Sequence, residues 1–435
     1  MDLRFFNARQ VYAKGKNDVQ KQETRHMKDG KKKTKKKKWL KKRHAVIVAL
    51  AKPFLGTFVR WKSGVRVRRF REQGDRQYLV VMNHQTVFDQ FFVSMAFKRP
   101  VYYIATEDIF SNGFISKLLR WAVNPIPIKK QTLDMRAIMN CIQVAKEGGT
   151  IALAPEGNRT YSGKTAYIKP AIAKLVKKLG LPLAIFRIEE GYGVQPRWCD
   201  QVRKGKMYAG VTRVVEPEEY KTLSDDELFE IIRSELDVNE ACIGGPFTGK
   251  HLAEYLERAI YVCPVCGLAA HESNGDIIEC TKCHRKVQYL PTRELKGVDW
   301  ELPFKFVADW YEYQYSVVNK LDPAQYVNEP MFRDVAGVSE VILYKKKVPI
   351  HEEAQLALYG NRVVINEGQE TELVMPFDEV SSVAVLGRNK LNMYFGDKVY
   401  QMKGGKRFNA LKYVNLYHRY MNVKEGNPDG EFLGL

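Results

Sequence analysis

The sequence predicts an α/β domain, followed by a cysteine-rich insert and a small β-rich segment that ends in a helix. Between residues 78 and 215, short apolar runs alternate with stretches of helical periodicity, a pattern typical of α/β proteins. Two Cys-x2-Cys pairs follow after about residue 255, and apolar runs of strand type begin after about residue 335. The 435 residues are enough for roughly two to four domains.

The apolar pattern places the individual elements. In the α/β part we expect strands at 78–82, 101–105, 150–153, 183–188 and 207–215. We expect helices at 87–97, 133–146, 170–179 and 224–236. Gly180 should end the third helix, and the capping-box pattern that starts at Ser224 should begin the fourth. In the last part we expect strands at 356–365, 371–385 and 390–402, then a helix at 408–421.

The charge of the chain favours an anionic partner. The net charge is +20, and residues 28–43 hold eleven basic residues and one Asp, which is half of the excess. Such a run should be disordered in solution, because it cannot bury apolar surface and repels itself. Three partners fit this charge: a membrane surface, a phosphorylated substrate and nucleic acid. A tail that only keeps the chain in solution is the remaining alternative.

An apolar stretch at 45–59 follows the basic run and favours the membrane among these partners. It is interrupted by Lys52 and Pro53 and is shorter than the roughly twenty residues needed to span a bilayer. A polybasic segment beside a short apolar helix suits reversible attachment to an anionic leaflet. No secretory signal is expected, and the seven Cys show no disulfide framework. We therefore expect peripheral attachment to the cytoplasmic face of a membrane, with nucleic acid ranked last.

Two short blocks, each directly after a predicted strand, carry the chemistry. They are Asn83-His84-Gln85-Thr86-Val87-Phe88-Asp89 and Pro155-Glu156-Gly157-Asn158-Arg159-Thr160. Sites in α/β sheets gather at the carboxyl ends of strands, so we expect the blocks to meet. His84 can act as a base whose tautomer Asp89 fixes, although a capping Asp and a surface His would give the same pattern.

The second block supplies a phosphate-binding group. Arg159 can hold phosphate oxygens through two parallel hydrogen bonds. Gly157 allows close backbone approach, and Glu156 can orient Arg159 or an acceptor hydroxyl. A structural ion pair between Glu156 and Arg159 is the alternative.

Together the blocks resemble the glycerolipid acyltransferases, specifically the 1-acylglycerol-3-phosphate (lysophosphatidate) acyltransferase family. Asn83, His84 and Asp89 match the family's Asn-His-x4-Asp motif, and residues 154–160 match in part its Phe-Pro-Glu-Gly-Thr-Arg-Ser motif. Residues 124–130 look like the family's intermediate block, a Gly followed by apolar residues and a phosphate-contacting Arg, and Lys130 of Lys129-Lys130 falls at the Arg position. The resemblance covers about residues 45–240 and implies a glycerolipid-acyltransferase-like sheet flanked by helices.

The resemblance implies a reaction of phospholipid biosynthesis. A fatty acyl group would move from a thioester, acyl-CoA or acyl-carrier protein, to the free hydroxyl of lysophosphatidate, giving phosphatidate. His84 would deprotonate that hydroxyl, and no serine acyl-enzyme or catalytic metal is expected. Arg159, Lys129 and Lys130 would anchor the phosphate, together with Glu156 and Gly157. Glycerol phosphate or another lysophospholipid as acceptor stays open, as does a non-enzymatic binding protein with an inactive domain.

The cysteine-rich insert predicts a zinc ribbon. Thirteen residues separate the two Cys-x2-Cys pairs. The four cysteines are Cys263, Cys266, Cys280 and Cys283. Two such knuckles present four thiolates to one Zn²⁺, and a filled shell leaves no position for water, so the metal should be structural.

The last segment vaguely resembles pleckstrin-homology or GRAM-type domains. Its basic residues, at 345–347, Arg388 and Lys390, form either a lipid-headgroup surface or a solvated charged face. The expected domain ranges are therefore a tail at 1–43, an acyltransferase domain with a membrane-interface segment at 44–255, a ribbon at 256–291, a linker at 292–334 and a β-rich domain at 335–423.

Overall fold

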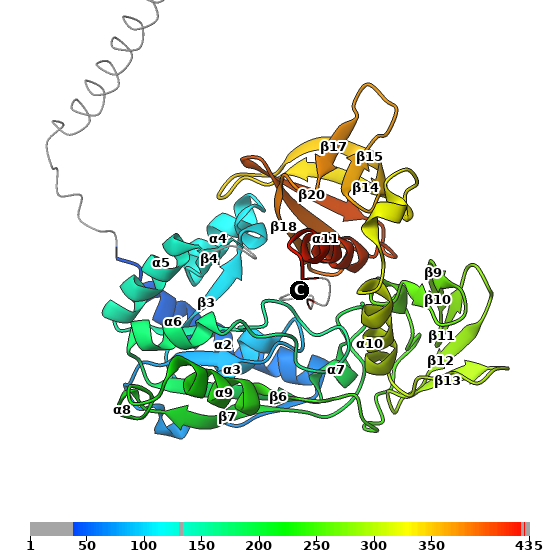
Figure 1. The fold of residues 1–435 in the computed structure, drawn as a ribbon. Coiled ribbons are helices and arrows are strands. Elements are labelled where there is room, and N and C mark those ends of the chain that lie inside the picture. Colours follow the sequence, from blue (N-terminus) through cyan, green and yellow to red (C-terminus); the bar gives the residue numbers. More distant parts are fainter. Residues whose placement is uncertain (1–37, 130–133, 428–429, 431–435) are drawn as a thin grey trace, which may run out of the picture. The chain divides into compact units, whose positions relative to one another are not determined.

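A seven-stranded sheet forms the centre of the first domain in the computed structural model, which describes residues 38–129, 134–427 and 430 (Figure 1). In spatial order its strands are β1 (Val65–Val67), β7 (Met207–Val215), β6 (Leu183–Glu189), β2 (Leu79–Met82), β5 (Thr150–Leu153), β3 (Val101–Thr106) and β4 (Ile126–Ile128). Neighbouring strands are parallel except β6 and β7, which are antiparallel. The predicted α/β class is confirmed. The short strands β1 and β4 were not predicted.

Helices cover both faces of this sheet. Val80 and Met82 of β2 pack with α2 (Lys42–Ser63) and α3 (Asp89–Ala96). Leu79 and Val81 pack on the other face, against α5 (Met135–Lys146), α6 (Ala171–Leu179) and α9 (Asp225–Leu236). The remaining short elements of this domain are η1 (Arg71–Gln73), η2 (Glu107–Phe110), α4 (Phe114–Ala122), α7 (Gly191–Val194), α8 (Pro217–Tyr220) and η3 (Leu256–Arg258). Burial on both faces explains why β2 is apolar throughout.

The predicted helix boundaries agree with the local chemistry. The capping box is present at α9, where Ser224 and Glu227 exchange side-chain and backbone hydrogen bonds. Gly180 ends α6 in the left-handed conformation, with φ of 65°. Asp134 caps α5 by accepting from two backbone N–H groups.

The cysteine-rich region forms two small antiparallel units. A hairpin of β8 (Val262–Cys263) and β9 (Gly267–Leu268) precedes a four-stranded sheet of β10 (His271–Asn274), β11 (Ile277–Cys280), β12 (Lys286–Tyr289) and β13 (Leu295–Val298). The range expected as a linker, 292–334, contains β13, α10 (Val307–Val318), η4 (Pro323–Tyr326) and the start of the next strand. This range is therefore structured for much of its length.

The C-terminal part is a β-domain of seven antiparallel strands followed by helix α11 (Leu411–Lys424). In spatial order the strands are β17 (Leu373–Pro376), β16 (Arg362–Ile365), β15 (Val348–Leu358), β14 (Phe332–Glu340), β20 (Lys398–Gly404), β19 (Lys390–Phe395) and β18 (Val380–Leu386). Each of the three long strands predicted here is wrong as a single element, because a turn divides it. The third, for example, is broken at Gly396, which has φ of 59°.

These parts share a core. One cluster of buried residues contains Trp198 of the first domain, Tyr289 of the ribbon sheet and Tyr413 of α11. Trp198 and Tyr289 meet edge to face with 5.4 Å between ring centroids. Helix α10 contacts both β8 and α11. Residues 39–435 accordingly form one compact unit.

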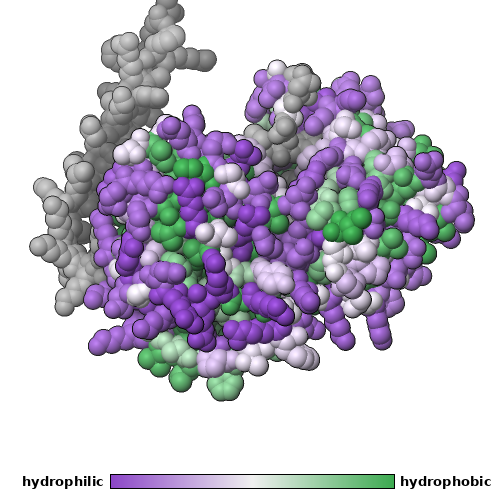
Figure 2. Space-filling view, turned by 90° about the horizontal axis from the view of Figure 1, so that it is seen from below, coloured by the Kyte–Doolittle hydropathy of each residue, from purple (hydrophilic) through white to green (hydrophobic). Residues whose placement is uncertain are grey.

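Helix α2 presents an apolar stripe to the surface. Its exposed large side chains recur every three or four residues: Val46, Leu50, Phe54, Phe58 and Trp61. Phe54 and Trp61 are 78% and 77% exposed. Figure 2 shows one face of the molecule, on which hydrophobic patches interrupt a mostly hydrophilic surface. Among the described residues, none of the helices has the combination of length and hydropathy required to cross a bilayer. The predicted basic tail at 1–43 lies mostly outside the described residues.

Candidate active site

The imidazole of His84 is fixed by Asp89. His84 follows β2, Asp89 is the first residue of α3, and Nδ1 of His84 lies 2.7 Å from Oδ2 of Asp89. The buried carboxylate also accepts from the backbone N–H groups of Gln85 (2.8 Å) and Thr86 (2.9 Å) and from the Thr86 hydroxyl (2.7 Å). These bonds hold Asp89 in place, and its bond to Nδ1 leaves Nε2 of His84 to act on a substrate.

The backbone at His84 is held from three sides. The Asn83 amide exchanges two 2.8 Å hydrogen bonds with the backbone of Ile188 at the end of β6. Glu156 accepts the His84 N–H at 2.7 Å, and the His84 carbonyl accepts the Thr160 N–H at 3.2 Å. The two predicted blocks therefore meet, as expected from their positions at the carboxyl ends of β2 and β5.

The carboxylate of Glu156 connects the loop that contains His84 with the loop that contains Ala166. One carboxylate oxygen accepts from His84 N–H, and the other accepts from Ala166 N–H at 2.8 Å. Burial raises the pKa of Glu156 to about 8, and the two backbone N–H groups oppose that rise. Both carboxylate oxygens of Glu156 thus contact backbone N–H groups. Its expected role in orienting Arg159 or an acceptor hydroxyl, or in binding phosphate, stays a prediction.

Gly157 forms the turn between Glu156 and Arg159. It has φ of +70°, its N–H bonds to the Ala154 carbonyl at 3.0 Å, and a Cβ at this position would meet nothing within 4 Å. The glycine is needed for its backbone conformation. Space alone would admit a larger residue.

Arg159 is a buried cation that forms no ion pair within the described part of the chain. The residue is only 7% exposed, and its Nη1 has no hydrogen-bond partner in the described part of the chain. Burial and, next, the like charges of Arg197 and Arg388 lower the pKa of Arg159 to about 9, and the charge of Asp89 partly opposes this shift. Three arginines from distant segments thus gather here. Arg197 was missed because no motif surrounds it, and Arg388 was assigned to either a lipid-headgroup surface or a solvated charged face.

The other predicted cations are at the edge of the site. Lys129 directly follows β4, is exposed, and lines the same cavity as His84 and Arg159. Its backbone N–H bonds to Asp134 at 2.9 Å. Lys130, predicted beside it, lies outside the described residues.

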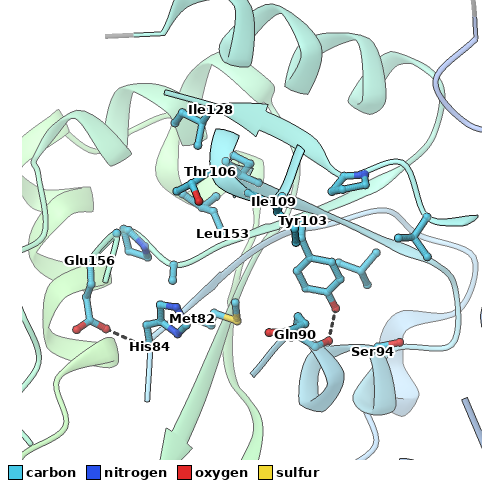
Figure 3. A pocket seen from close by; sticks show the side chains of 18 of the residues that line it. Met82, His84, Gln90, Ser94, Tyr103, Thr106, Ile109, Ile128, Leu153 and Glu156 are labelled. Atoms are coloured by element: carbon cyan, nitrogen blue, oxygen red, sulfur yellow. Dashed lines mark hydrogen bonds between the residues drawn. The ribbon is translucent and has the colours of Figure 1, made fainter. Parts of the chain in front are cut away.

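One cavity of about 1030 Å³ joins these groups. His84, Glu156, Gly157, Arg159 and Arg197 line it together with a mostly apolar wall. Figure 3 shows His84 and Glu156 with the wall residues Met82, Tyr103 and Leu153. Apolar wall residues come from α2, β2, β3, α5 and β5, among them Ile47, Val48, Ala51, Met82, Tyr103, Ala137 and Leu153. The volume is at the upper end of the about 300 to 1,000 Å³ usual for ligand pockets. A long apolar chain with an anionic end fits a cavity of this composition.

The four predicted metal ligands come together at a separate site. The sulfurs of Cys263, Cys266, Cys280 and Cys283 all lie within 4.8 Å of one another. The pairs 263–283 and 266–280 are both separated by 3.6 Å. Tetrahedral Zn²⁺ with Zn–S bonds of about 2.3 Å requires sulfurs about 3.8 Å apart, so the cluster has the dimensions of a four-thiolate zinc site.

The comparison with family models supports an acyltransferase domain. A family model described as Acyltransferase matches residues 59–189, which include both blocks. The crystal structure of PlsC, the 1-acyl-sn-glycerophosphate (LPA) acyltransferase from Thermotoga maritima, is similar over 45% of this chain and 76% of that chain, with 23% identity and a TM-score of 0.37. The solution structure of the N-terminal PH domain of human ARAP2 is similar over 21% of this chain and 81% of that chain, with 13% identity and a TM-score of 0.18. None of the curated proteins matches.

Proposed function

We propose that this chain, which carries an acyltransferase domain at residues 59–189, transfers a fatty acyl group from a thioester to the free hydroxyl of 1-acylglycerol 3-phosphate, giving phosphatidate. One observation carries the proposal. The oriented base His84 and the buried cation Arg159 line the same apolar cavity. That cavity therefore offers a base for the hydroxyl, a cation for the phosphate and an apolar wall for an acyl chain.

The geometry provides for direct transfer. His84 Nε2 takes the proton of the acceptor hydroxyl while the hydroxyl oxygen attacks the thioester carbonyl, and Asp89 stabilises the resulting imidazolium. The tetrahedral intermediate collapses by breaking the C–S bond, and the thiolate takes up the proton held by His84. Because a thiol has a pKa of about 8.5, the thiolate leaves with little acid assistance.

Purified protein supplied with acyl-CoA or acyl-carrier protein and lysophosphatidate should form phosphatidate. His84→Ala should lower kcat by roughly 10²- to 10⁴-fold, because it removes the general base. His351→Ala is the matched control, since His351 lies on β15 and does not line the cavity. Undiminished phosphatidate formation by His84→Ala would rule out the proposal. A panel of glycerol phosphate and other lysophospholipids tests the choice of acceptor.

We also propose that the chain attaches to the cytoplasmic face of a membrane through α2 and α4. The exposed stripe of α2 is joined by four exposed apolar residues of the contacting helix α4: Phe114, Ile115, Leu118 and Trp121. Exposed apolar surface of this extent marks an interaction site, and the guanidinium of Arg43, 5.4 Å from the Trp121 ring, adds a charge suited to anionic lipid. Another face of α2 lines the cavity through Ile47, Val48 and Ala51, so one helix connects the lipid phase to the site.

Vesicle sedimentation tests this attachment. The protein should bind vesicles that contain phosphatidylserine more strongly than neutral vesicles, and Phe54→Asp should weaken binding to both. Val335→Asp is the matched control, because Val335 is 48% exposed on β14, outside α2 and α4. Equal binding by Phe54→Asp and wild type would exclude α2 as the attachment helix.

We propose that the four-cysteine cluster holds one structural Zn²⁺. The metal would join β8 and β9 to the β10–β13 sheet, since each Cys-x2-Cys pair lies on one of these units. Elemental analysis should find about one zinc per chain, and Cys280→Ser should lose it. Cys242→Ser, at an exposed cysteine outside the cluster, should retain the metal. Zinc-free wild-type protein with an unchanged melting temperature would refute a structural role.

A further inference from the structure

The turn between β18 and β19 forms part of the cavity wall. Leu386 and Gly387 line the same cavity as His84, although they belong to the C-terminal β-domain. The next residue along this turn is Arg388, whose side chain is 28% exposed. A segment from outside the acyltransferase domain thus borders the candidate active site.

Arg197 ties this turn to the second block. Its Nη1 donates to the Arg159 carbonyl at 3.1 Å, and its Nε and Nη2 reach the carbonyls of Gly387 (3.4 Å) and Val385 (3.5 Å). Its guanidinium also lies over the Tyr161 ring, 4.3 Å from the centroid. One buried arginine therefore sets the position of Arg159 relative to the C-terminal β-domain.

A second contact fixes the same domain from another side. Asp108, in η2, forms ion pairs with Lys347 and with Lys390 (3.2 Å) and accepts from the Gln401 amide at 3.0 Å. Lys347 and Lys390 are thus used for docking, and are neither a free headgroup surface nor a solvated charged face. With contacts at both ends, the β18–β19 turn is held against the cavity.

Two of the three arginines form no ion pair among the described residues, and the third shares its partner. Neither Arg159 nor Arg197 forms an ion pair with any carboxylate in the described ranges. Arg388 lies 3.3 Å from Asp200, but the same oxygen of Asp200 already accepts from Arg258 at 2.6 Å. Nη1 of Arg159 and Nε of Arg388 are both buried without a hydrogen-bond partner among the described residues. A buried donor of a charged group without a partner is costly, so Nη1 of Arg159 and Nε of Arg388 favour a ligand that supplies a further anion.

We propose that Arg388 of the C-terminal β-domain binds the acceptor phosphate together with Arg159, so that the acceptor is held between two domains. This inference rests on the proposed function and adds a specificity-determining residue to it. The ligand class is a phosphate monoester, because its two negative charges and three terminal oxygens match several converging guanidinium groups. A phosphodiester headgroup offers one charge fewer and should bind less well.

Kinetics of the full chain test the proposal. Arg388→Gln should raise the KM for lysophosphatidate by roughly 10- to 100-fold, the effect of losing a hydrogen bond between charged groups. The KM for the acyl donor and kcat should stay close to wild type. Arg388→Lys keeps the charge but loses the planar guanidinium, so its KM for lysophosphatidate should lie between those of wild type and Arg388→Gln. The matched control is Arg333→Gln, an arginine of the same domain that pairs with Glu367 at the surface.

A role for Arg388 that is only structural makes a different prediction. If Arg388 acts by holding Asp200, then Asp200→Asn should raise the KM for lysophosphatidate as much as Arg388→Gln does. If Arg388 binds phosphate, Asp200→Asn should leave this KM unchanged or lower it, because the arginine loses a competing anion. An equal rise in both variants, or an unchanged KM in Arg388→Gln, would overturn the inference.

Equilibrium binding separates this inference from the proposed function. Lysophosphatidate should bind the His84→Ala protein, and adding Arg388→Gln should weaken that binding roughly 10- to 100-fold. Acyl transfer with an unaltered KM in Arg388→Gln would leave the function standing and overturn the inference. If lysophosphatidate binding depends on Arg388 but wild type transfers no acyl group, the phosphate-binding role of Arg388 would stand and the proposed function would be refuted. Neither transfer nor Arg388-dependent binding would refute both.

Discussion

The carboxylate of Asp89 accepts hydrogen bonds from His84, from two backbone N–H groups and from a hydroxyl. Arg159 lines the same cavity as His84, yet its Nη1 has no partner among the described residues, and its neighbours Arg197 and Arg388 carry the same charge. The base region, His84 and Asp89, thus has its hydrogen-bond partners within the protein. The arginine region, Arg159 with Arg197 and Arg388, leaves a buried donor without a partner among the described residues. In the proposed function, preorganisation of His84 serves the proton transfer, and the unpaired charge of Arg159 provides binding energy for the acceptor.

The two regions also differ in how the chain assembles them. His84 and Asp89 come from one turn between β2 and α3. The arginines come from the loop after β5, the segment after α7 and the β18–β19 turn. Substitutions should also have different effects on the free energy of unfolding. Loss of hydrogen bonds should lower it at Asp89, whereas removal of a like charge should leave it unchanged or raise it at Arg159. This contrast can be tested by measuring turnover and unfolding on the same variants.

Asp89→Asn should have the largest effect. The amide cannot accept all the hydrogen bonds that the carboxylate accepts, and it no longer stabilises the His84 imidazolium. We expect kcat to fall by roughly 10²- to 10⁴-fold, and the free energy of unfolding to fall by about 1 to 3 kcal/mol. Steady-state kinetics and urea unfolding measure both. Asp378→Asn, at a surface pair with Lys424, should change neither. A stable Asp89→Asn protein would show that the base region is less tightly built than its contacts indicate.

Arg159→Gln should weaken binding without weakening the fold. We expect the KM for lysophosphatidate to rise by roughly 10- to 100-fold. The free energy of unfolding without ligand should be unchanged or higher by about 1 kcal/mol, because a buried charge beside two like charges is removed.

Thermal unfolding with and without lysophosphatidate extends this test. Ligand should raise the melting temperature of wild type and have little effect on Arg159→Gln. Arg233→Gln, an exposed arginine on α9, should behave like wild type. A marked loss of stability in Arg159→Gln would mean that the arginine is part of the fold's own support, contrary to the comparison.

The same contrast explains what the sequence could predict. The base region is local, so the spacing of His84 and Asp89 and their place after a strand were enough. Arg388 was out of reach as a site residue, because only tertiary packing through Arg197 brings the β18–β19 turn to the cavity. The long strands predicted after residue 350 failed for another reason. An antiparallel hairpin continues the same apolar alternation on both sides of a short turn, so each hairpin looks like one strand.

Glu156→Gln should have a smaller effect on turnover than Asp89→Asn, because Glu156 contacts the backbone of His84 while Asp89 contacts its imidazole. Its clearest consequence should be a change in how stability depends on pH. Burial raises the pKa of Glu156 from the ordinary 4.5 to about 8. Between these values the folded protein keeps a proton that the unfolded chain has released, so this group lowers the free energy of unfolding as pH rises from 4.5 to 8.

The slope contributed by Glu156 should be at most about 1.4 kcal/mol per pH unit, and it should be absent above pH 8, where both states have lost the proton. Glutamine does not titrate, so the difference in unfolding free energy between wild type and Glu156→Gln should change with pH in this window and level off outside it. Urea unfolding across pH 4.5 to 8 measures the difference. Parallel profiles would show that Glu156 is ionised in the folded protein. The backbone N–H groups of His84 and Ala166 would then outweigh its burial, and Glu156 would be an anion held by the two loops that it joins.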